Sequence, residues 1–480
     1  MKQRHYIDYK LYLTRSPDDQ SICQVALLPT AEVGESKQPV EVSTSNVPSQ
    51  DLLSALANKS ITQRQLVELG KQLANCLLPD GEIRALFTEA LHRLDVAGGL
   101  RLRLILADNA LRQWPWEYTY LNLLEGPEAM RNFLVLDPRI SFVRHEPLPR
   151  PHVVIPPADQ DITELHMVVA SALPKGARYL QVEQEVENIR RAVNDFNLEG
   201  VHITCDPVLI DVTPDELDRA LRGTESAYLF HFAGHGITTI GRDTFNRGGT
   251  IEEGFLLLVK DKTSKAESRL NANDLAVMLQ RAGVRLVVLG ACHSGARNER
   301  YPWDGIAGAL VAHDIPAIIA MQYEINDDQA VVFSDTFYSA LGSGLSLDEA
   351  MSLGRLAMLR SADPDPDKLF NVEWGVPVLY SRLSSGALFP ERMARAGAVA
   401  EQFRKIINQT VERIEKDGKV IGIEAKRVKG GFKVEQRVDV VSGTLLGAKV
   451  GTVEENATFA IDQTAGTVTG EVIGGTFDEL

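Results

Sequence analysis

The chain has 480 residues, of which 44% are hydrophobic and 24% are charged, the balance of an ordinary globular protein. This composition excludes a disordered chain, a collagen-like repeat and a disulfide-rich scaffold. With 65 acidic and 50 basic residues the formal net charge is −15, which disfavours broad binding of nucleic acids or anionic membranes. No apolar run reaches the length of a membrane span, and the opening MKQRHYIDYKLYL keeps charges where a signal peptide is apolar.

The four cysteines, Cys23, Cys76, Cys205 and Cys292, are scattered singly and form no CxxC pair. Free thiols of this kind are typical of a reducing compartment, so we expect a cytoplasmic protein without structural disulfides. Cys76 falls in a helical pattern and is expected to be a thiol of the core.

Residues 1–148 are predicted to form an N-terminal, non-catalytic half. Alternating or compact apolar runs predict strands at 6–15, 100–108 and 133–145, and residues 49–78 have helical spacing. Five prolines follow in the stretch PLPRPHVVIPP. Because proline fixes φ and lacks a backbone donor, we place a domain junction in that stretch.

From 155 to 390, short apolar strands alternate with helices. The predicted strands are LHMVVASA, VHITCDPVLI, AYLFHFAGHG, GFLLLVKD, VRLVVLGACHSG and IPAIIAMQY. Helices are predicted over 271–282 and 304–313, and capping boxes at Thr213–Glu216 and Ser346–Glu349 mark two further helix starts. This alternation predicts an α/β fold with a mostly parallel sheet flanked by helices.

Residues 395–480 are predicted to form a separate module. Apolar residues between Val399 and Ile414 recur at helical spacing and predict an amphipathic helix over 395–416. The remaining residues alternate at period two between Gly-rich turns, which predicts a small β-rich module with a weak echo between SGTLLGAKVGTV and AGTVTGEVIGGT. We expect the module to bind a regulatory partner or to self-associate through open sheet edges, the alternative being a stabilising extension.

Two of the predicted strands end in reactive residues. His235 closes AYLFHFAGHG and is followed by Gly236, and Cys292 lies near the end of VRLVVLGACHSG. Ligands meet parallel sheets at the carboxyl ends of the strands, and imidazole titrates in the range needed to activate a thiol. The pair predicts Cys292 as nucleophile and His235 as general base, with the N–H groups of Gly236 and Cys292 as donors to an oxyanion.

Other interpretations fit these residues less well. A lone cysteine after an apolar strand is usually a buried hydrophobe, but here it accompanies a histidine in a second Gly-flanked strand end. A zinc site using His231 and His293 is disfavoured, because His231 falls inside a strand and no fourth ligand has a typical spacing. We therefore expect no metal and no cofactor.

These motifs resemble the CHAT family of caspase-like cysteine peptidases, relatives of separase in the clan that includes caspases and metacaspases. HFAGHG and ACHSG carry the resemblance, supported by Pro115-Trp116-Glu117 upstream and GIAGALVAHDIPAIIAMQYEINDD downstream, over roughly residues 85–388. The resemblance implies a caspase-type fold, with His235 as general base, the Cys292 thiolate as nucleophile, and an oxyanion hole made by Gly236 and Cys292.

The resemblance leaves the substrate open. Metacaspases carry an Asp two residues before the nucleophile to read a basic P1 side chain, and this sequence has Gly290 there. The Asn326-Asp327 pair also fits a plain helix N-cap. The candidate substrate-binding residues are Glu324, Asp327, Asp328, Trp303 and Asp304.

The hypothesis from the sequence is a cytoplasmic cysteine endopeptidase that cleaves a specific protein partner on activation, in bacterial antiviral defence or signalling. The alternative hypothesis is a non-catalytic, peptide-binding scaffold that recruits partners through residues 395–480. Neither hypothesis involves direct contact with nucleic acid or with a membrane.

Overall fold

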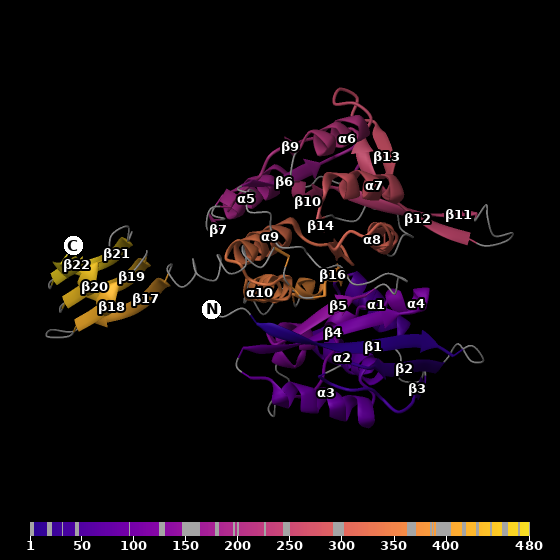
Figure 1. Cartoon of the computed structure of the whole chain (residues 1–480), viewed down its shortest axis with the longest axis horizontal. Helices are drawn as coiled ribbons and strands as arrows, with labels where there is room; N and C mark the ends of the chain where they lie inside the picture. The colour runs from indigo at the N-terminus through magenta and orange to yellow at the C-terminus, as the bar shows by residue number, and fades with distance from the viewer. Residues whose placement is uncertain are drawn as a thin grey trace. The chain divides into compact units, whose positions relative to one another are not determined.

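The structure is a computed structural model in which the chain divides into two compact units, Lys2–Ala394 and Arg395–Leu480 (Figure 1). The residues it describes are 4–16, 22–30, 32–43, 48–95, 97–123, 130–145, 164–177, 182–194, 197–198, 201–224, 227–242, 250–290, 302–361, 371–384, 386, 388–389, 405–414, 419–428, 432–441, 444–453, 459–468 and 471–479.

The larger unit is built on one long sheet. Within the described ranges it has 13 strands, in the order β3-β2-β1-β4-β5-β16-β15-β14-β10-β6-β8-β7, with β9 also pairing with β6. Most neighbouring strands run parallel, which confirms the predicted α/β fold. The strands are β1 (His5–Arg15), β2 (Ile22–Leu28), β3 (Val40–Ser43), β4 (Gly98–Leu106), β5 (Ile140–Arg144), β6 (Glu164–Ser171), β7 (Asn197–Leu198), β8 (Val201–Thr204), β9 (Val208–Leu209), β10 (Ala227–Ala233), β14 (Leu286–Gly290), β15 (Ala317–Met321) and β16 (Pro377–Ser381).

Helices cover both faces of this sheet (Figure 1). They are α1 (Gln50–Ala57), α2 (Gln63–Leu77), α3 (Glu82–Arg93), α4 (Asn109–Arg112), α5 (Val182–Asn194), α6 (Pro214–Gly223), α7 (Ala272–Ala282), α8 (Pro302–Ala312), α9 (Asp327–Gly342) and α10 (Leu347–Arg360). Both predicted capping boxes are present, at the starts of α6 and α10. None of the helices in the described ranges is both long enough and apolar enough to cross a membrane.

The strands of the second half are buried on both faces, as their continuous apolar sequences predict. Along β14, Val287 and Leu289 pack into one core with residues of α6, α7 and α8. Leu286 and Val288 point to the opposite face and join the core formed with α5, α9 and α10. Alternate residues of β10 and β14 therefore face opposite sides of the sheet and contact different groups of helices.

The predicted GFLLLVKD strand exists, but it belongs to a different sheet. It lies in β12 (Thr250–Val259), which pairs antiparallel with β11 (His235–Arg242) and β13 (Glu267–Asn271). The side-chain alternation of a strand identifies the strand but carries no information about its partner. This small sheet packs against α8, where a Cβ at Gly254 would lie 2.6 Å from the Ile306 side chain.

The Pro-Trp-Glu element braces the N-terminal half against the end of β15. The Glu117 carboxylate is buried and accepts hydrogen bonds from Arg144 at 2.8 Å and from the Gln322 side chain at 3.0 Å. Gln322 directly follows β15, so its hydrogen bond to Glu117 ties the N-terminal half to the second half of the sheet. Tyr118 packs so closely on Gly375 that a Cβ there would lie 2.4 Å from the tyrosine ring.

In its described residues, the smaller unit has six strands in two parallel sheets. One sheet has the order β17-β19-β21 and the other β18-β20-β22. The helix predicted over 395–416 is wrong over Lys405–Ile414, which forms β17, and the rest of that range lies outside the described residues. The remaining strands are β18 (Lys419–Val428), β19 (Phe432–Val441), β20 (Thr444–Val453), β21 (Phe459–Val468) and β22 (Glu471–Glu479).

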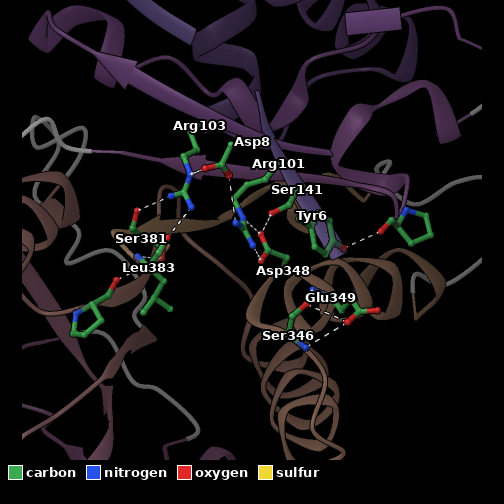
Figure 2. A network of polar contacts seen from close by, with 12 residues as sticks. Tyr6, Asp8, Arg101, Arg103, Ser141, Ser346, Asp348, Glu349, Ser381 and Leu383 are labelled. Carbon is green, nitrogen blue, oxygen red and sulfur yellow. Dashed lines mark hydrogen bonds and ion pairs between the residues drawn. The ribbon is translucent and has the colours of Figure 1, made fainter. Parts of the chain in front are cut away.

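A buried network of charges joins the two halves of the large sheet (Figure 2). Arg101 and Arg103 both project from β4, and Asp8 on β1 contacts the two guanidinium groups at 3.3 and 2.8 Å. Arg101 also binds Asp348, near the start of α10, through two hydrogen bonds of 2.8 and 2.5 Å. Arg103 donates to the Leu383 carbonyl at 2.7 Å, just beyond β16, which pairs with β5.

The electrostatics of this network depend on the Arg101–Asp348 pair. Burial alone would raise the pKa of Asp348, but the Arg101 guanidinium and the hydrogen bonds from Arg101 and Ser141 outweigh burial and lower it. Burial and the neighbouring Arg101 charge lower the pKa of Arg103. The two arginines therefore tolerate each other only while both carboxylates are ionised.

Replacing Asp348 by Ala is expected to lower the free energy of unfolding by about 3–5 kcal/mol, because the Arg101 charge stays buried without its main partner. Urea unfolding followed by circular dichroism measures the change. Asp218→Ala, which removes the partner of the largely exposed Arg222 on α6, is the matched control and should have little effect.

The sign of the pH dependence follows from the lowered pKa of Asp348. The stabilisation is present above the unfolded-state pKa near 4 and disappears as the pH falls through the lower folded-state value. Asp348→Asn should therefore flatten the acid limb of stability against pH. An Asp348→Ala protein as stable as the Asp218→Ala control would refute the role given to the pair.

Candidate active site

The candidate site lies where β10 and β14 end side by side. These strands are parallel neighbours, and Ala233 at the end of β10 is the register partner of Gly290 at the end of β14. His235 follows Ala233 by two residues, and Cys292 follows Gly290 by two residues. The predicted adjacency of the two strand ends is therefore confirmed for the strands themselves.

Gly234 makes the turn between β10 and the next strand. Its N–H donates a hydrogen bond to the Gly290 carbonyl at 3.2 Å. A Cβ at this position would lie 2.6 Å from the Phe232 ring and 3.0 Å from the Ala172 carbonyl oxygen. Only glycine fits this close approach, which explains the Gly in the FAGHG string.

His235 is the first residue of β11 and does not continue β10 as the sequence suggested. Its side chain is fully buried, and Gly236, the predicted oxyanion donor, is buried beside it in the same strand. Among the described residues β11 pairs only with β12, so alternate N–H groups along β11 point away from that ladder. His235 thus stands where the parallel sheet gives way to the small antiparallel one.

A second buried histidine, His231, lies on the α5 and α9 face of β10. Its Nδ1 is 2.8 Å from the Tyr338 hydroxyl of α9, and its Nε2 is 3.2 Å from Oε1 of Glu185 on α5. Burial raises the pKa of Tyr338 well above its ordinary value, so this hydroxyl keeps its proton. The His231 ring thus bridges Tyr338 and Glu185, and the predicted placement of His231 inside a strand is confirmed.

The Glu185 carboxylate occupies the space that a side chain at position 290 would take. A Cβ built on Gly290 would lie 3.0 Å from Oε1 of Glu185 and 3.3 Å from Nε2 of His231. The Glu185 side chain is 14% exposed, so the carboxylate lies at the edge of the buried network. A carboxylate is therefore held in space beside position 290, which precedes Cys292 by two residues and carries no side chain of its own.

The three described cysteines are unsuited to nucleophilic chemistry. Cys23, Cys76 and Cys205 are all free and buried. Burial raises the pKa of Cys76 to about 12 and that of Cys205 to about 11, and it raises the pKa of Cys23 as well. Each remains a protonated thiol at neutral pH, and the prediction that Cys76 is a core residue is confirmed.

The remaining predicted site residues are placed unevenly. Cys292 and His293 lie outside the described residues. Trp303 and Asp304 belong to the first turn of α8, and their side chains are also outside the description. Glu324 lies half-buried between β15 and α9, and Asp327 and Asp328 are the first two residues of α9.

Asn326 is the N-cap residue of α9, as predicted by the interpretation of Asn326-Asp327 as a plain helix N-cap. Its side chain does not cap the helix but donates to Glu373 at 3.0 Å. Glu373 also accepts from the Asn326 backbone N–H at 2.7 Å and from Lys59 at 2.5 Å. The EINDD segment is thereby anchored to the N-terminal half through Lys59.

Sequence reasoning missed Glu185 and Tyr338. Glu185 lies in VEQEVENIRR, where glutamates occupy positions 183, 185 and 187, and nothing local shows which glutamate meets β14. The usable signal is the helix register: Val186 and Ile189 are core positions, and Glu185 borders that stripe whereas Glu187 is exposed. In the described ranges no group of three His, Cys, Asp or Glu residues is arranged to hold a metal ion.

These features define an α/β protein with a mostly parallel sheet, in which two adjacent strand ends lead to a histidine and a cysteine. The family model of the CHAT domain matches residues 67–403, well over half of the chain. The chain belongs to the CHAT-domain family.

Comparison with curated proteins gave no match. Among solved structures, the chain is similar to the Arg-specific cysteine proteinase gingipain R, with 12% identity over 65% of this chain and 69% of that one, and a TM-score of 0.36. It is also similar to protein GSU0716 from Geobacter sulfurreducens, with 17% identity over 46% of this chain and 93% of that one, and a TM-score of 0.26.

A thiol reagent such as iodoacetamide is expected to modify one cysteine per native chain at pH 7.5, because burial protects the three described thiols and keeps them protonated. Intact-protein mass spectrometry counts the adducts, and denatured protein should take four. Cys292→Ala should abolish native labelling and leave three adducts after denaturation. Native labelling that persists in this variant would assign the reactive thiol to another cysteine.

Proposed function

We propose that this protein is a cysteine endopeptidase in which Cys292 is the nucleophile and His235 the general base. The observation that carries the proposal is the Ala233–Gly290 register pair, since each proposed catalytic residue follows one of its members by two positions. Two residues of extended chain span at most about 7 Å, so covalent geometry keeps both residues near the same pair. The burial of the other three cysteines supports the same choice.

In the proposed reaction His235 takes the proton of the Cys292 thiol, and the thiolate attacks the carbonyl carbon of the scissile peptide bond. The resulting oxyanion is stabilised by the N–H groups of Gly236 and Cys292. The C–N bond then breaks as His235 gives its proton to the leaving amine, which leaves a thioester on Cys292. Water, deprotonated by His235, hydrolyses the thioester and regenerates the free thiol.

We further propose that Glu185 selects a basic P1 side chain. The sequence argument against such a substrate was the absence of a carboxylate at Gly290, but Glu185 supplies a carboxylate at that point from α5. Its Oε1 is fixed by His231, so the group is preorganised. A partly exposed, oriented carboxylate suits a guanidinium or ammonium group. Glu324, Asp327 and Asp328 are further candidate contacts, as are Trp303 and Asp304.

The proposed biological role is cleavage of a specific protein partner, on activation, in bacterial defence or signalling within the cytoplasm. The competing proposal is a peptide-binding scaffold without activity. A scaffold would bind the partner equally well with and without Cys292 and would cleave nothing.

Cys292→Ala is expected to lower kcat at least about 10³-fold, and His235→Ala about 10²- to 10⁴-fold, because one removes the nucleophile and the other its base. Cleavage of a peptide library, read by mass spectrometry, measures both. Cys76→Ala and His92→Ala, on α2 and α3 of the N-terminal half, are the matched controls. Undiminished cleavage by Cys292→Ala would refute the proposed mechanism.

Glu185→Gln is expected to lower kcat/KM for substrates with Lys or Arg at P1 about 10- to 100-fold, since a hydrogen bond to a charged group contributes about 1.5–3 kcal/mol. Substrates with a neutral P1 should be affected much less. Glu187→Gln, on the exposed side of the same helix, is the control. An equal loss for every P1 residue would show that Glu185 only supports the fold.

A further inference from the structure

The smaller unit is a parallel solenoid of three turns. Lys405 on β17 pairs with Phe432 on β19, which pairs with Phe459 on β21, so each turn advances 27 residues in this sheet. In the other sheet Lys419 pairs with Thr444 and Thr444 with Glu471, steps of 25 and 27 residues. Each turn contributes one strand to each sheet, which defines three rungs: β17 with β18, β19 with β20, and β21 with β22. The sequence echo aligned Thr444 with Thr467, but the register pairs Thr444 with Glu471.

Equivalent positions of successive rungs stand directly opposite one another. Gln409, Gln436 and Gln463 form one continuous row across the first sheet. Such in-register rows are the arrangement in which parallel strands stack most regularly. Successive rungs thus repeat the same parallel pairing in both sheets.

Both ends of this solenoid present sheet edges. Among the described residues, β17 and β18 each have one neighbour at the first end, and β21 and β22 each have one neighbour at the last end. An edge strand carries a row of backbone N–H and C=O groups that can pair with another chain, and solenoids remain single only when their ends are capped. The two ends therefore offer complementary backbone surfaces.

The charge of the rungs changes steadily from one end to the other. The first rung holds five basic residues and two acidic ones, and the middle rung three basic and two acidic. The last rung holds four acidic residues and no basic one. The solenoid therefore has a basic first end and an acidic last end.

The register brings these opposite charges to matching positions in a stack. Lys419 pairs with Thr444 and Thr444 with Glu471, so a second copy continuing the same register would place its Lys419 opposite Glu471. In the same way Arg427 of the second copy would stand opposite Glu479, because both pair with Thr452.

Lys426 precedes Arg427 and Asp478 precedes Glu479, so the same register places Lys426 of the second copy opposite Asp478 as a third oppositely charged pair. Every acidic residue of β22 would then face a basic residue of β18. Across the whole contact no two like charges would stand opposite each other, because Asp462 would face Asn408 and Lys405 would face Phe459. Oppositely charged cross-strand pairs are favourable and like-charged ones unfavourable, so the register selects this head-to-tail contact.

We propose that the occupant of these open edges is a second copy of this chain, stacked head to tail so that its first rung continues the last rung of its neighbour. The contact is heterologous, so it does not close at two copies and produces linear assemblies. Stacking gathers the attached units of Lys2–Ala394 at high local concentration. The proposal is independent of whether those units cleave peptides.

The test uses the full-length chain and two charge-reversed variants. The first-end variant carries Lys419→Glu, Lys426→Glu and Arg427→Glu, and the last-end variant carries Glu471→Lys, Asp478→Lys and Glu479→Lys. Analytical ultracentrifugation at low ionic strength is expected to show concentration-dependent assembly of the wild type that weakens with added salt. Each variant alone should sediment as a monomer, because its two ends then carry like charges.

Mixing the two variants is the decisive arm. Each end of one then meets an oppositely charged end of the other, so an equimolar mixture should assemble as the wild type does, which also shows that both variants are folded. A control with Lys433→Glu, Arg437→Glu and Lys449→Glu in the middle rung changes the net charge as much as the first-end variant does. This control should assemble, because both of its ends keep their charges. A wild type that stays monomeric, variants that assemble alone, or a mixture that does not would each overturn the proposal.

Discussion

Two arginines on one face of a buried strand impose the arrangement of the large unit. Arg101 and Arg103 repel each other on β4 and cannot reach water, so their charges require carboxylates and carbonyls from other elements. Asp8 comes from the same half of the sheet, but Asp348 and the Leu383 carbonyl come from α10 and the chain after β16. The buried guanidinium groups of the N-terminal half have all of these partners only when that half is docked on the second half. That docking positions β16, and through it β15, β14 and β10, in one continuous sheet.

The parts of the fold that depend on local chemistry were predictable from the sequence. Thr213 and Ser346 cap their helices as expected, since a capping box is complete within four residues. The ends of β10 and β14 were close to their predicted places because glycine interrupts both strands. The pairing of β12 was not predictable, because alternation specifies a buried face but not a neighbour.

The incorrect helix at 395–416 has a specific cause. Apolar residues at Ile406, Ile407, Val411 and Ile414 fit a helical stripe, yet all four are β-branched and favour a strand. The deciding signal is long-range: Gln409 recurs at Gln436 and Gln463, at the spacing of one solenoid turn. A window of one helix length cannot contain such a repeat, so local periodicity favoured the wrong structure.

The candidate site shows the same limit in its side chains. His235 was found because it sits beside glycines at a strand end, but Glu185 reaches Gly290 from a helix some hundred residues earlier in the chain. A side chain from another element can occupy the space of a side chain that is absent at one position. Position 290 considered alone in the sequence therefore shows only that it carries no carboxylate. The proposed selecting group and the proposed nucleophile then lie on separate elements, α5 and the chain after β14. Substrate preference can therefore change without altering the strand that leads to Cys292.

Charge sets a further constraint on the smaller unit. The chain as a whole carries −15, so two copies repel each other at long range, and non-specific attraction gives no route to assembly. The basic first rung is an exception within this acidic chain, and its three cations on β18 match in register the three carboxylates of β22. General repulsion combined with one complementary pair of ends favours a single contact geometry over all others. The overall negative charge and the opposite charges of the two solenoid ends together support the proposed head-to-tail contact.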